Sequence, residues 1–567
     1  MSSILDKDSP GGASPADTGD TKLNRHVGRI GLLFAGVGSI IGSGWLFGAM
    51  NAAKTAGPAA TISWALGGFM ILLIGLCYAE LGTMFPLSGG VVRFPHISFG
   101  SFASYMTGWI TWVACMAVAP IEVEGALTYA TKYADFTTVK CVDACSSDAP
   151  VTVHTLTGLG MVVAIIAMAV FVVINYFGVR WFARVNNILV WWKLIIIAIV
   201  IVAFLVTHFD GGNFTSKGFA PMGAHGMFTA IATSGIVFSF LGFRQGIELA
   251  GETDNPRRNV PFAVIGSVLL CALIYVLLQV AFIGALSGGD LAKGWSQVNF
   301  ADDFGPLAAI ATILGLGWLA TLLYIDAIVS PADTGLIYTT VTSRISYAMA
   351  RNGNAPQALA KTTKNGVPLI SMILAFFVGL ILFLPFPSWQ QLVGFITSAT
   401  VLSFGSGPLV LMTFRKQIPE HERPFRLPGG KVVAFFAFWS ANLIVYWTGW
   451  ETNSKLFMAV LLGVVLLGVM YVVNAAKGQQ PQWDWKGGSW YIPWLGGLAL
   501  ISWLGDYGGG QGVLHFDTAF PVTFVFSIIV MAWSYYVQLP RDQVDVYIEH
   551  SQAEAQAEEV ELGASAH

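Results

Sequence analysis

Five glycines and two serines fall within residues 36–48, GVGSIIGSGWLFG, inside an apolar stretch near the start of the chain. About 20 apolar residues allow a helix to span a bilayer, yet glycine weakens a helix. Where a helix unwinds inside a bilayer, its free N–H and C=O groups must face a cavity, other protein groups or a ligand. The segment is therefore a candidate binding site. The simpler alternative is a helix contact of small residues such as Gly38 and Gly42.

A second interruption lies five apolar windows later, in the segment FSFLGFRQGIELAGE. There Gly242 and Gly246 bracket Phe243, Arg244 and Gln245. Interrupted helices at corresponding places in two halves of a membrane protein are typical of inverted-repeat transporters. The paired interruptions favour a substrate site between two broken helices.

Broken helices offer both kinds of backbone group to a ligand. Free N–H groups at the start of a helix suit a carboxylate, and freed carbonyl groups suit an ammonium group. The expected N–H donors are Gly42, Ser43 and Gly44, and the expected carbonyl acceptors are Ile40, Phe238 and Leu241. Together these groups predict a site for an α-amino acid.

Ionisable residues inside apolar windows are further candidates. Lys193, in NNILVWWKLIIIAIV, lies about nine residues into its window and so roughly 13 Å deep at 1.5 Å per residue. A lysine there is costly and should face the protein interior, where it couples protons or simply pairs with another group. Asp326 and Asp333 lie seven residues apart and share a helix face. Either is a proton carrier or the counter-ion of the lysine, and we favour Asp333.

Two glutamates in the segment APIEVEGALTYATKY, Glu122 and Glu124, point to different faces of one helix. Only one of them can readily face a central cavity. We take Glu122 as a third candidate for proton coupling. The alternative is a carboxylate near the outer mouth of the cavity.

The elements that must position these residues are membrane helices. The chain has 567 residues, of which 55% are hydrophobic and 11% charged, with a mean hydropathy of +0.66 and a net charge of −3. This composition indicates an all-α polytopic protein of the lipid bilayer and suggests no nucleic-acid partner. Fourteen apolar windows fall near residues 29–53, 58–85, 101–131, 153–176, 184–207, 226–251, 261–286, 307–340, 368–385, 389–413, 432–450, 456–475, 489–505 and 518–538.

Lysine and arginine collect on one side of these windows, which the positive-inside rule assigns to the cytoplasm. An even number of spans then places both termini in the cytoplasm, and we expect a multi-pass protein of the cell (inner) membrane. No cofactor is expected, because no metal-ligand spacing or nucleotide-binding loop occurs. Cys141 and Cys145 share a predicted external loop, where a disulfide can form.

Four motifs, two of which contain the interruptions described above, occur in order between residues 29 and 368: GSIIGSGWLFG, CYAELGTMFPLSGGVVRF, FSFLGFRQGIELAGETDNPRRNVP and SRISYAMARNGNAP. They resemble the first span, the end of the second span with its re-entrant loop, the sixth span and the end of the eighth span of the amino acid-polyamine-organocation (APC) superfamily. The number of spans resembles its bacterial aspartate-proton symporter branch.

The resemblance implies a leucine-transporter-like fold of two inverted five-helix repeats, with broken first and sixth helices and about four extra C-terminal helices. We therefore expect a disordered cytoplasmic tail at residues 1–25, a ten-helix transport core at 26–415, additional transmembrane helices at 416–540 and an acidic cytoplasmic tail at 541–567. The resemblance also places Lys193 where related transporters bind a coupling sodium, between the first, fifth and eighth spans.

The expected activity is proton-coupled uptake of amino acids, with amino acids and protons as partners and no enzymatic reaction. Exchange of neutral or other amino acids is the alternative, and a non-transporting membrane sensor is a distant one. The sequence leaves the oligomeric state open.

Arg244 departs from the family pattern, in which many members carry a carboxylate at this place. The planar fork of arginine can hold a carboxylate through two parallel bonds. A side chain that enters the cavity would therefore select aspartate or glutamate, and we favour this role. The alternative is an ion pair with Glu248, four residues on, that contributes no selectivity.

Overall fold

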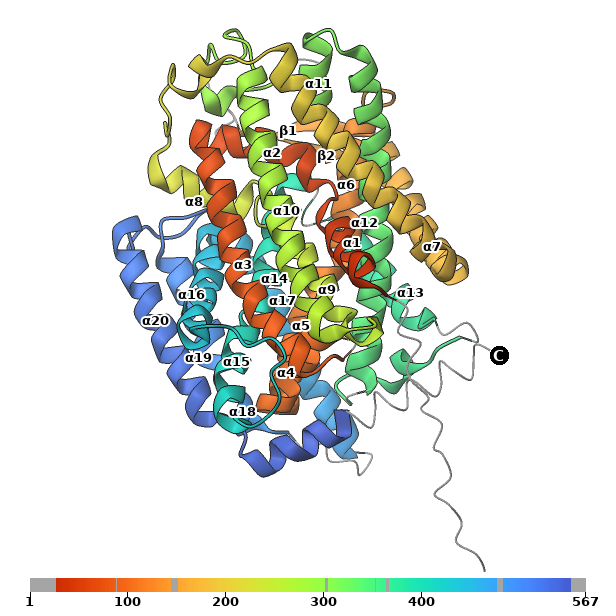
Figure 1. Cartoon of the computed structure of the whole chain (residues 1–567), viewed down its shortest axis with the longest axis vertical. Coiled ribbons are helices and arrows are strands. Elements are labelled where there is room, and N and C mark those ends of the chain that lie inside the picture. The colour runs from red at the N-terminus through yellow and green to blue at the C-terminus, as the bar shows by residue number, and fades with distance from the viewer. Residues whose placement is uncertain are drawn as a thin grey trace, which may run out of the picture.

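The computed structural model describes residues 27–87, 89–143, 151–300, 304–351, 353–363, 367–384, 386, 388–476 and 483–551. The predicted tail at residues 1–25, residues 552–567 of the predicted C-terminal tail, and Cys145 lie outside the described residues. Within these ranges the chain is a bundle of helices, most of which run along the long axis of the molecule (Figure 1).

The helices begin and end at defined residues throughout the bundle. In the first half they are α1 (Arg29–Ile40), α2 (Gly44–Ala56), α3 (Ala60–Met84), α4 (Gly90–Phe99), α5 (Ser101–Met116), α6 (Val118–Ala130), α7 (Gly158–Thr207), α8 (Gly223–Thr233), α9 (Gln245–Glu248) and α10 (Pro256–Ala285). In the second half they are α11 (Pro306–Ile313), α12 (Gly317–Arg351), α13 (Leu369–Leu382), α14 (Trp389–Phe404), α15 (Ser406–Gln417), α16 (Gly430–Thr448), α17 (Trp450–Ala476), α18 (Trp485–Gly488), α19 (Tyr491–Leu504) and α20 (Phe516–Val537). The short 3-10 helices are η1 (Gly57–Ala59), η2 (Gly211–Phe214), η3 (Phe238–Arg244), η4 (Ala250–Glu252), η5 (Trp295–Gln297) and η6 (Gln357–Ala360).

Each of the fourteen predicted windows contains a helix, but not every helix is long enough to cross a bilayer by itself. Among the described residues, ten helical segments are long and apolar enough, or eleven when one bent pair is counted as one span. The remaining windows fall on shorter helices, such as α1 with 12 residues and α13 with 14. The all-α polytopic fold is confirmed.

The first and sixth spans are both broken, as predicted. The first break separates α1 from α2 and contains residues 41–43. The second separates α8 from η3, with a bend of 45° between the two parts.

The predicted position of the second break is wrong. In the structure the second break lies at residues 234–237, where Gly235 has φ of +95°, a conformation that favours glycine. Gly242 instead allows close packing of η3 on α1, because a Cβ atom there would lie 2.4 Å from the backbone nitrogen of Ile40. At Gly246 a Cβ atom would lie 3.2 Å from Cγ2 of Val264 on α10, a tight contact with a side chain.

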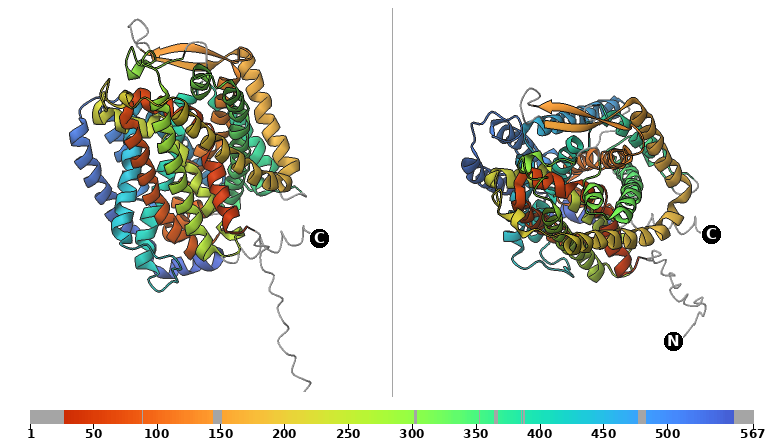
Figure 2. Two further views of the ribbon diagram at one scale, coloured as in Figure 1. Left: turned by 45° about the horizontal axis from the view of Figure 1, so that its top comes forward. Right: turned by 90° about the horizontal axis from the view of Figure 1, so that it is seen from above.

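A β-hairpin that the sequence analysis did not predict lies at the end of the bundle opposite α4 (Figure 2). Its strands, β1 (Thr137–Asp143) and β2 (Val151–Leu156), are antiparallel. At the other end of the bundle, residues 541–551 form a helix with Val544 buried, so this part of the predicted tail is packed against the protein.

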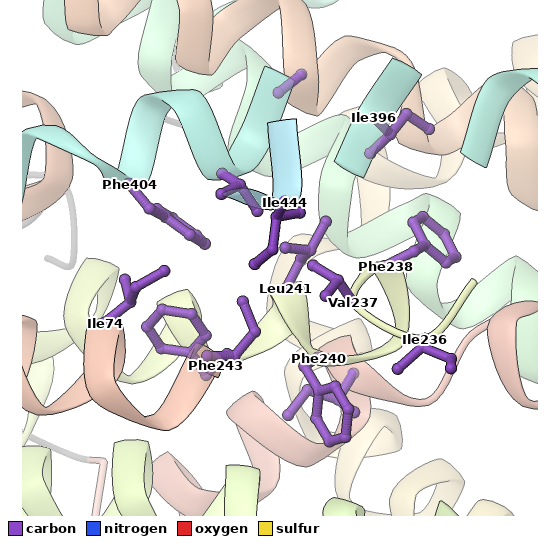
Figure 3. Packing of buried hydrophobic residues seen from close by; sticks show 14 of the residues in the cluster. Ile74, Ile236, Val237, Phe238, Phe240, Leu241, Phe243, Ile396, Phe404 and Ile444 are labelled. Atoms are coloured by element: carbon purple, nitrogen blue, oxygen red, sulfur yellow. The ribbon is translucent and has the colours of Figure 1, made fainter. Parts of the chain in front are cut away.

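The core of the bundle is apolar around the second break. Figure 3 shows Phe240, Leu241 and Phe243 of η3 packed among side chains of α3, α14 and α16, including Phe404 and Ile444. Among the C-terminal helices, α16, α19 and α20 lie side by side along one flank of the molecule (Figure 1), and α17 packs on α14 and α19. Because α16 packs on α3, α8 and α14, this flank supports α8, the helix that leads into the second break.

Candidate functional site

The break in the first span gives one backbone N–H a new partner. In a continuous helix the N–H of Ser43 would donate to the carbonyl of Ser39, four residues earlier. Here it donates to Oε2 of Glu122 on α6, at 2.6 Å. Glu122 is 1% exposed. A buried carboxyl group of the protein thus lies where the sequence predicts the carboxylate of a substrate.

Glycines make this close approach possible. A Cβ atom at Gly42 would lie 2.5 Å from Oε1 of Glu122. One at Gly44 would lie 2.3 Å from Oγ of Ser239 on η3. Both distances are too short for a real contact, so a larger residue at either position would force the side chain of Glu122 or Ser239 to move.

The rotation of α6 decides which glutamate faces the break. Gly125 lies one turn after Glu122, and a Cβ atom there would lie 2.7 Å from Cβ of Ser43. This face therefore packs directly on the first span. Glu124 is also buried, but neither of its carboxyl oxygens has a hydrogen-bond partner among the described residues.

The carbonyl side of the same break binds Lys193 of α7. In a continuous helix the carbonyl of Gly38 would accept a hydrogen bond from the N–H of Gly42. Here the Gly42 N–H donates to the carbonyl of Ile40 instead, at 3.2 Å. Nζ of Lys193 donates to the released carbonyl of Gly38 at 2.9 Å and to Oγ1 of Thr334 at 3.4 Å. It also lies 2.7 Å from Oδ2 of Asp333 on α12, in a fully buried ion pair. The ammonium therefore joins α1, α7 and α12, the first, fifth and eighth predicted spans.

Asp326 lies outside this ion pair. Its Oδ1 accepts hydrogen bonds from the indole of Trp192 at 2.8 Å and from Oγ of Ser330 at 2.7 Å. Of the two aspartates on this helix face, Asp333 is the ion-pair partner of Lys193.

A small cavity lies between the two broken helices. It is lined by residues of α1, α6, η3, α12 and α14: Ser39, Ile40, Val118, Glu122, Phe238, Leu241, Thr334, Tyr338, Ile396 and Thr400. Figure 3 shows Phe238 and Leu241 on the segment that follows the second break, with Ile396 on the neighbouring α14. The carbonyl of Ile40 accepts a hydrogen bond from the hydroxyl of Tyr275 at 3.4 Å.

Trp389, at the start of α14, covers the break and was missed by the sequence analysis. Its indole Nε1 donates to Oγ of Ser43 at 2.8 Å. Its ring lies 4.9 Å from that of Phe47 and 6.1 Å from that of Phe238. Nothing in the sequence around Trp389 marks it, because its role depends on how α14 packs against α2.

Arg244 is completely buried at the end of η3, one turn beyond Leu241. Its Nη2 donates to Oε1 of Glu248 at 3.0 Å, and its Nη1 donates to Sγ of Cys115 at 2.9 Å. Nε has no partner among the described residues. The alternative that the sequence offers for Arg244, an ion pair with Glu248, is thus formed. Arg244 is not among the residues that line the cavity.

The structure brings most of the predicted site residues into one region. Glu122 and the backbone of residues 40–43 meet at the first break, beside Phe238 and Leu241. Lys193 and Asp333 lie on the carbonyl side of that break. No group of three or more His, Cys, Asp or Glu side chains that could hold a metal ion occurs in the described parts of the chain.

Comparisons with known proteins agree with this architecture. Residues 31–485 match the amino acid permease family. The glutamate/serine transporter AimA of Bacillus subtilis is 37% identical over 516 residues, which cover 90% of this chain and 94% of that protein. The aspartate-proton symporter of the same organism is 35% identical over 528 residues, or 92% of this chain and 98% of the symporter. The branched-chain amino acid permease BcaP of B. subtilis is 27% identical over 455 residues, 80% of this chain and 94% of BcaP.

Proposed function

Because the chain belongs to the amino acid permease family, we propose that it is a secondary transporter that takes up amino acids together with protons and prefers aspartate and glutamate. Two relatives at 37% and 35% identity are named for the transport of glutamate and serine and for aspartate-proton symport. The helices long and apolar enough to span a membrane make it a multi-pass membrane protein. We further propose that it lies in the cell membrane with both termini in the cytoplasm, as the distribution of lysine and arginine predicts.

The observation that carries the proposal is the hydrogen bond from the Ser43 N–H to Glu122, at 2.6 Å. An N–H that is freed by a broken helix and already holds a carboxyl group is suited to the α-carboxylate of an amino acid. We propose that the substrate takes the place of Glu122, with Gly42 and Gly44 leaving room for it. The ammonium group of the substrate would then lie in the cavity near Ile40, Phe238 and Leu241.

Proton coupling follows from the charges around this site. Lys193 pairs with Asp333, and both charges act on Glu122. An acidic amino acid adds a further negative charge, and a net charge without a counter-ion is costly in a membrane interior. We propose that protons bound at Glu122 and at the Lys193–Asp333 pair compensate this charge. Protonated Glu122 accepts a weaker hydrogen bond than the carboxylate and so releases the Ser43 N–H more readily.

For the side-chain carboxylate of the substrate we propose Arg244. Glu248 holds one edge of its guanidinium, much as Glu122 holds the Ser43 N–H. Tyr338 lines the cavity and is near enough to Arg244 for the two groups to interact electrostatically. A substrate carboxylate that reaches past Tyr338 can exchange for Glu248 or bind the free Nε.

Uptake by reconstituted vesicles tests the transport activity. We expect vesicles without internal amino acid to accumulate labelled aspartate when the outside is acidified. If label enters only when the vesicles contain amino acid, the protein is an exchanger and the proton-coupled proposal is wrong.

Competition experiments test the specificity. We expect Arg244→Ala to reduce the preference for aspartate over serine by about tenfold or more, because a hydrogen bond to a charged group is worth roughly 1.5–3 kcal/mol. The matched control is Arg257→Ala, which removes an exposed arginine paired with Glu422. An unchanged preference in the Arg244 variant would exclude this arginine as the selective residue.

A further inference from the structure

Asp326 is a fully buried carboxyl group that the proposed proton-coupling site does not use. It lies on α12, on the same helix face as Ser330, Asp333 and Thr334. Only one of its oxygens is satisfied: Oδ1 accepts the two hydrogen bonds from Trp192 and Ser330, whereas Oδ2 has no partner among the described residues. Two neutral donors hold the group in place without neutralising it.

Among the residues that the structure describes, no cation forms an ion pair with Asp326. The charge of Lys193, which follows Trp192 in the chain, acts on Asp326, but its ammonium contacts Gly38, Thr334 and Asp333 instead. A buried carboxylate without a cation is so costly that such a group usually binds a proton instead. This arrangement allows both the protonated and the ionised form of Asp326. Oδ2 can carry the proton, and after the proton leaves the carboxylate keeps its two hydrogen bonds at Oδ1.

We propose that Asp326 is a further proton-binding site of this protein, in addition to Glu122 and the Lys193–Asp333 pair, and that it lies between this pair and the Gly317 end of α12. The proposal rests on the proton-coupled transport proposed above. A proton from water forms an O–H bond with a carboxylate oxygen of Asp326. This bond breaks when the proton later returns to water, and no other bond forms or breaks.

The surroundings of Asp326 connect this proton to the moving parts of the site. Trp192 belongs to α7, and Trp45, which belongs to α2 after the first break, also lies beside the carboxyl group. Charge at Asp326 therefore acts on α2, α7 and α12 together. These helices also carry Lys193 and Asp333 and adjoin the Ser43 N–H.

Several titratable groups among the described residues lie near this part of α12. They are Lys193 on α7, Asp333 and Tyr324 on α12 itself, Glu122 and Tyr129 on α6, and Tyr133, whose ring contacts that of Tyr324 as Tyr129 does. Among them the charge that acts most strongly on Asp326 is that of Lys193. We therefore expect the two sites to influence each other's protonation, so that their protons bind in two coupled steps.

The test is the pH dependence of uptake in vesicles that contain wild-type protein or Asp326→Asn. Asparagine resembles the protonated acid in shape and charge, and its carbonyl can accept both hydrogen bonds. We expect the variant to keep exchange of internal for external aspartate. The slope of the logarithm of proton-driven uptake against pH should fall by about one, since one titrating proton is lost. The control is Asp517→Asn, at an exposed position in the first turn of α20.

The outcomes separate this proposal from the proposed function. If wild-type uptake does not respond to a proton gradient, proton-coupled transport itself is wrong. If wild-type uptake responds and Asp326→Asn gives the same slope, Asp326 is not a proton site. Should the variant fail to fold, Trp192→Phe keeps the carboxyl group but removes one donor to it. Its pH profile should then shift to higher pH, and an unchanged profile would overturn the proposal.

Discussion

Replacement of Glu122 by glutamine tests whether a carboxyl group of the protein competes with that of the substrate. Oε2 of Glu122 accepts the Ser43 N–H at 2.6 Å. A hydrogen bond to a charged acceptor is worth about 1.5–3 kcal/mol, against about 0.5–1.5 kcal/mol for a neutral one. The glutamine oxygen can take the same position, so the substitution should weaken the competing bond by about 1–1.5 kcal/mol. We therefore expect Glu122→Gln to bind aspartate about five- to twelvefold more tightly than the wild type at high pH.

Isothermal titration calorimetry of the purified protein at low and high pH measures this difference. Wild-type affinity should fall as the pH rises, because an ionised Glu122 holds the Ser43 N–H more strongly. The affinity of the glutamine variant should depend much less on pH. The matched control is Glu124→Gln, since Glu124 is also buried on α6 but has no hydrogen bond to the first span. Weaker binding by Glu122→Gln at every pH would refute the reasoning and would indicate that Glu122 contacts the ammonium group of the substrate.

Three further substitutions test other parts of the site. Lys193→Met leaves Asp333 buried without its cation and should cost about 3–5 kcal/mol of stability. Adding Asp333→Asn should restore most of the Tm in thermal denaturation. Neither the single nor the double variant should accumulate substrate under a proton gradient. Gly44→Ala should weaken aspartate binding by about tenfold, equivalent to about 1.4 kcal/mol, because its Cβ atom would lie 2.3 Å from Oγ of Ser239. Adding Ser239→Ala should restore part of the affinity, as measured by calorimetry. Glu80→Gln removes the charge of a buried group that lies 2.6 Å from an arginine of α15 and should lower the Tm without changing the aspartate affinity of the folded protein.

The broken first span is predictable because glycine and serine gather where the helix ends. The second break is harder to place, because glycine serves two purposes. At Gly235 it allows a positive φ, whereas at Gly242 it allows two backbones to approach each other. Composition alone does not distinguish these uses, and the predicted break at Gly242 therefore lies about two helical turns beyond the real one at Gly235.

The polar residues of the site also divide into those whose contacts the sequence predicts and those whose contacts depend on packing. The facing positions of Lys193 and Asp333 follow from helix periodicity and from the cost of a charge in the membrane. Periodicity also shows that Glu122 and Glu124 face different directions, but not which of them faces the first span. The packing of Gly125 on Ser43 decides this. A glycine three residues after Glu122 is the signal in the sequence that marks the close-packed face.

The first break connects the substrate to the proton without a long path between them. On one side of residues 41–43, the released carbonyl of Gly38 accepts the ammonium of Lys193. On the other side, the N–H of Ser43 donates to Glu122. Gly38 lies in the last turn of α1 and Ser43 directly precedes α2, so the two contacts lie at the two ends of one short segment, and a movement of α2 relative to α1 changes how they lie relative to each other. Neutralisation of Lys193 would weaken its bond to Gly38 and loosen the segment to which the substrate carboxylate binds, whereas a bound carboxylate would stabilise the positive charge nearby. Coupling in this protein is therefore expected to depend on the unwound segment itself, and a substitution that favours continuous helix there should weaken proton binding and substrate binding together.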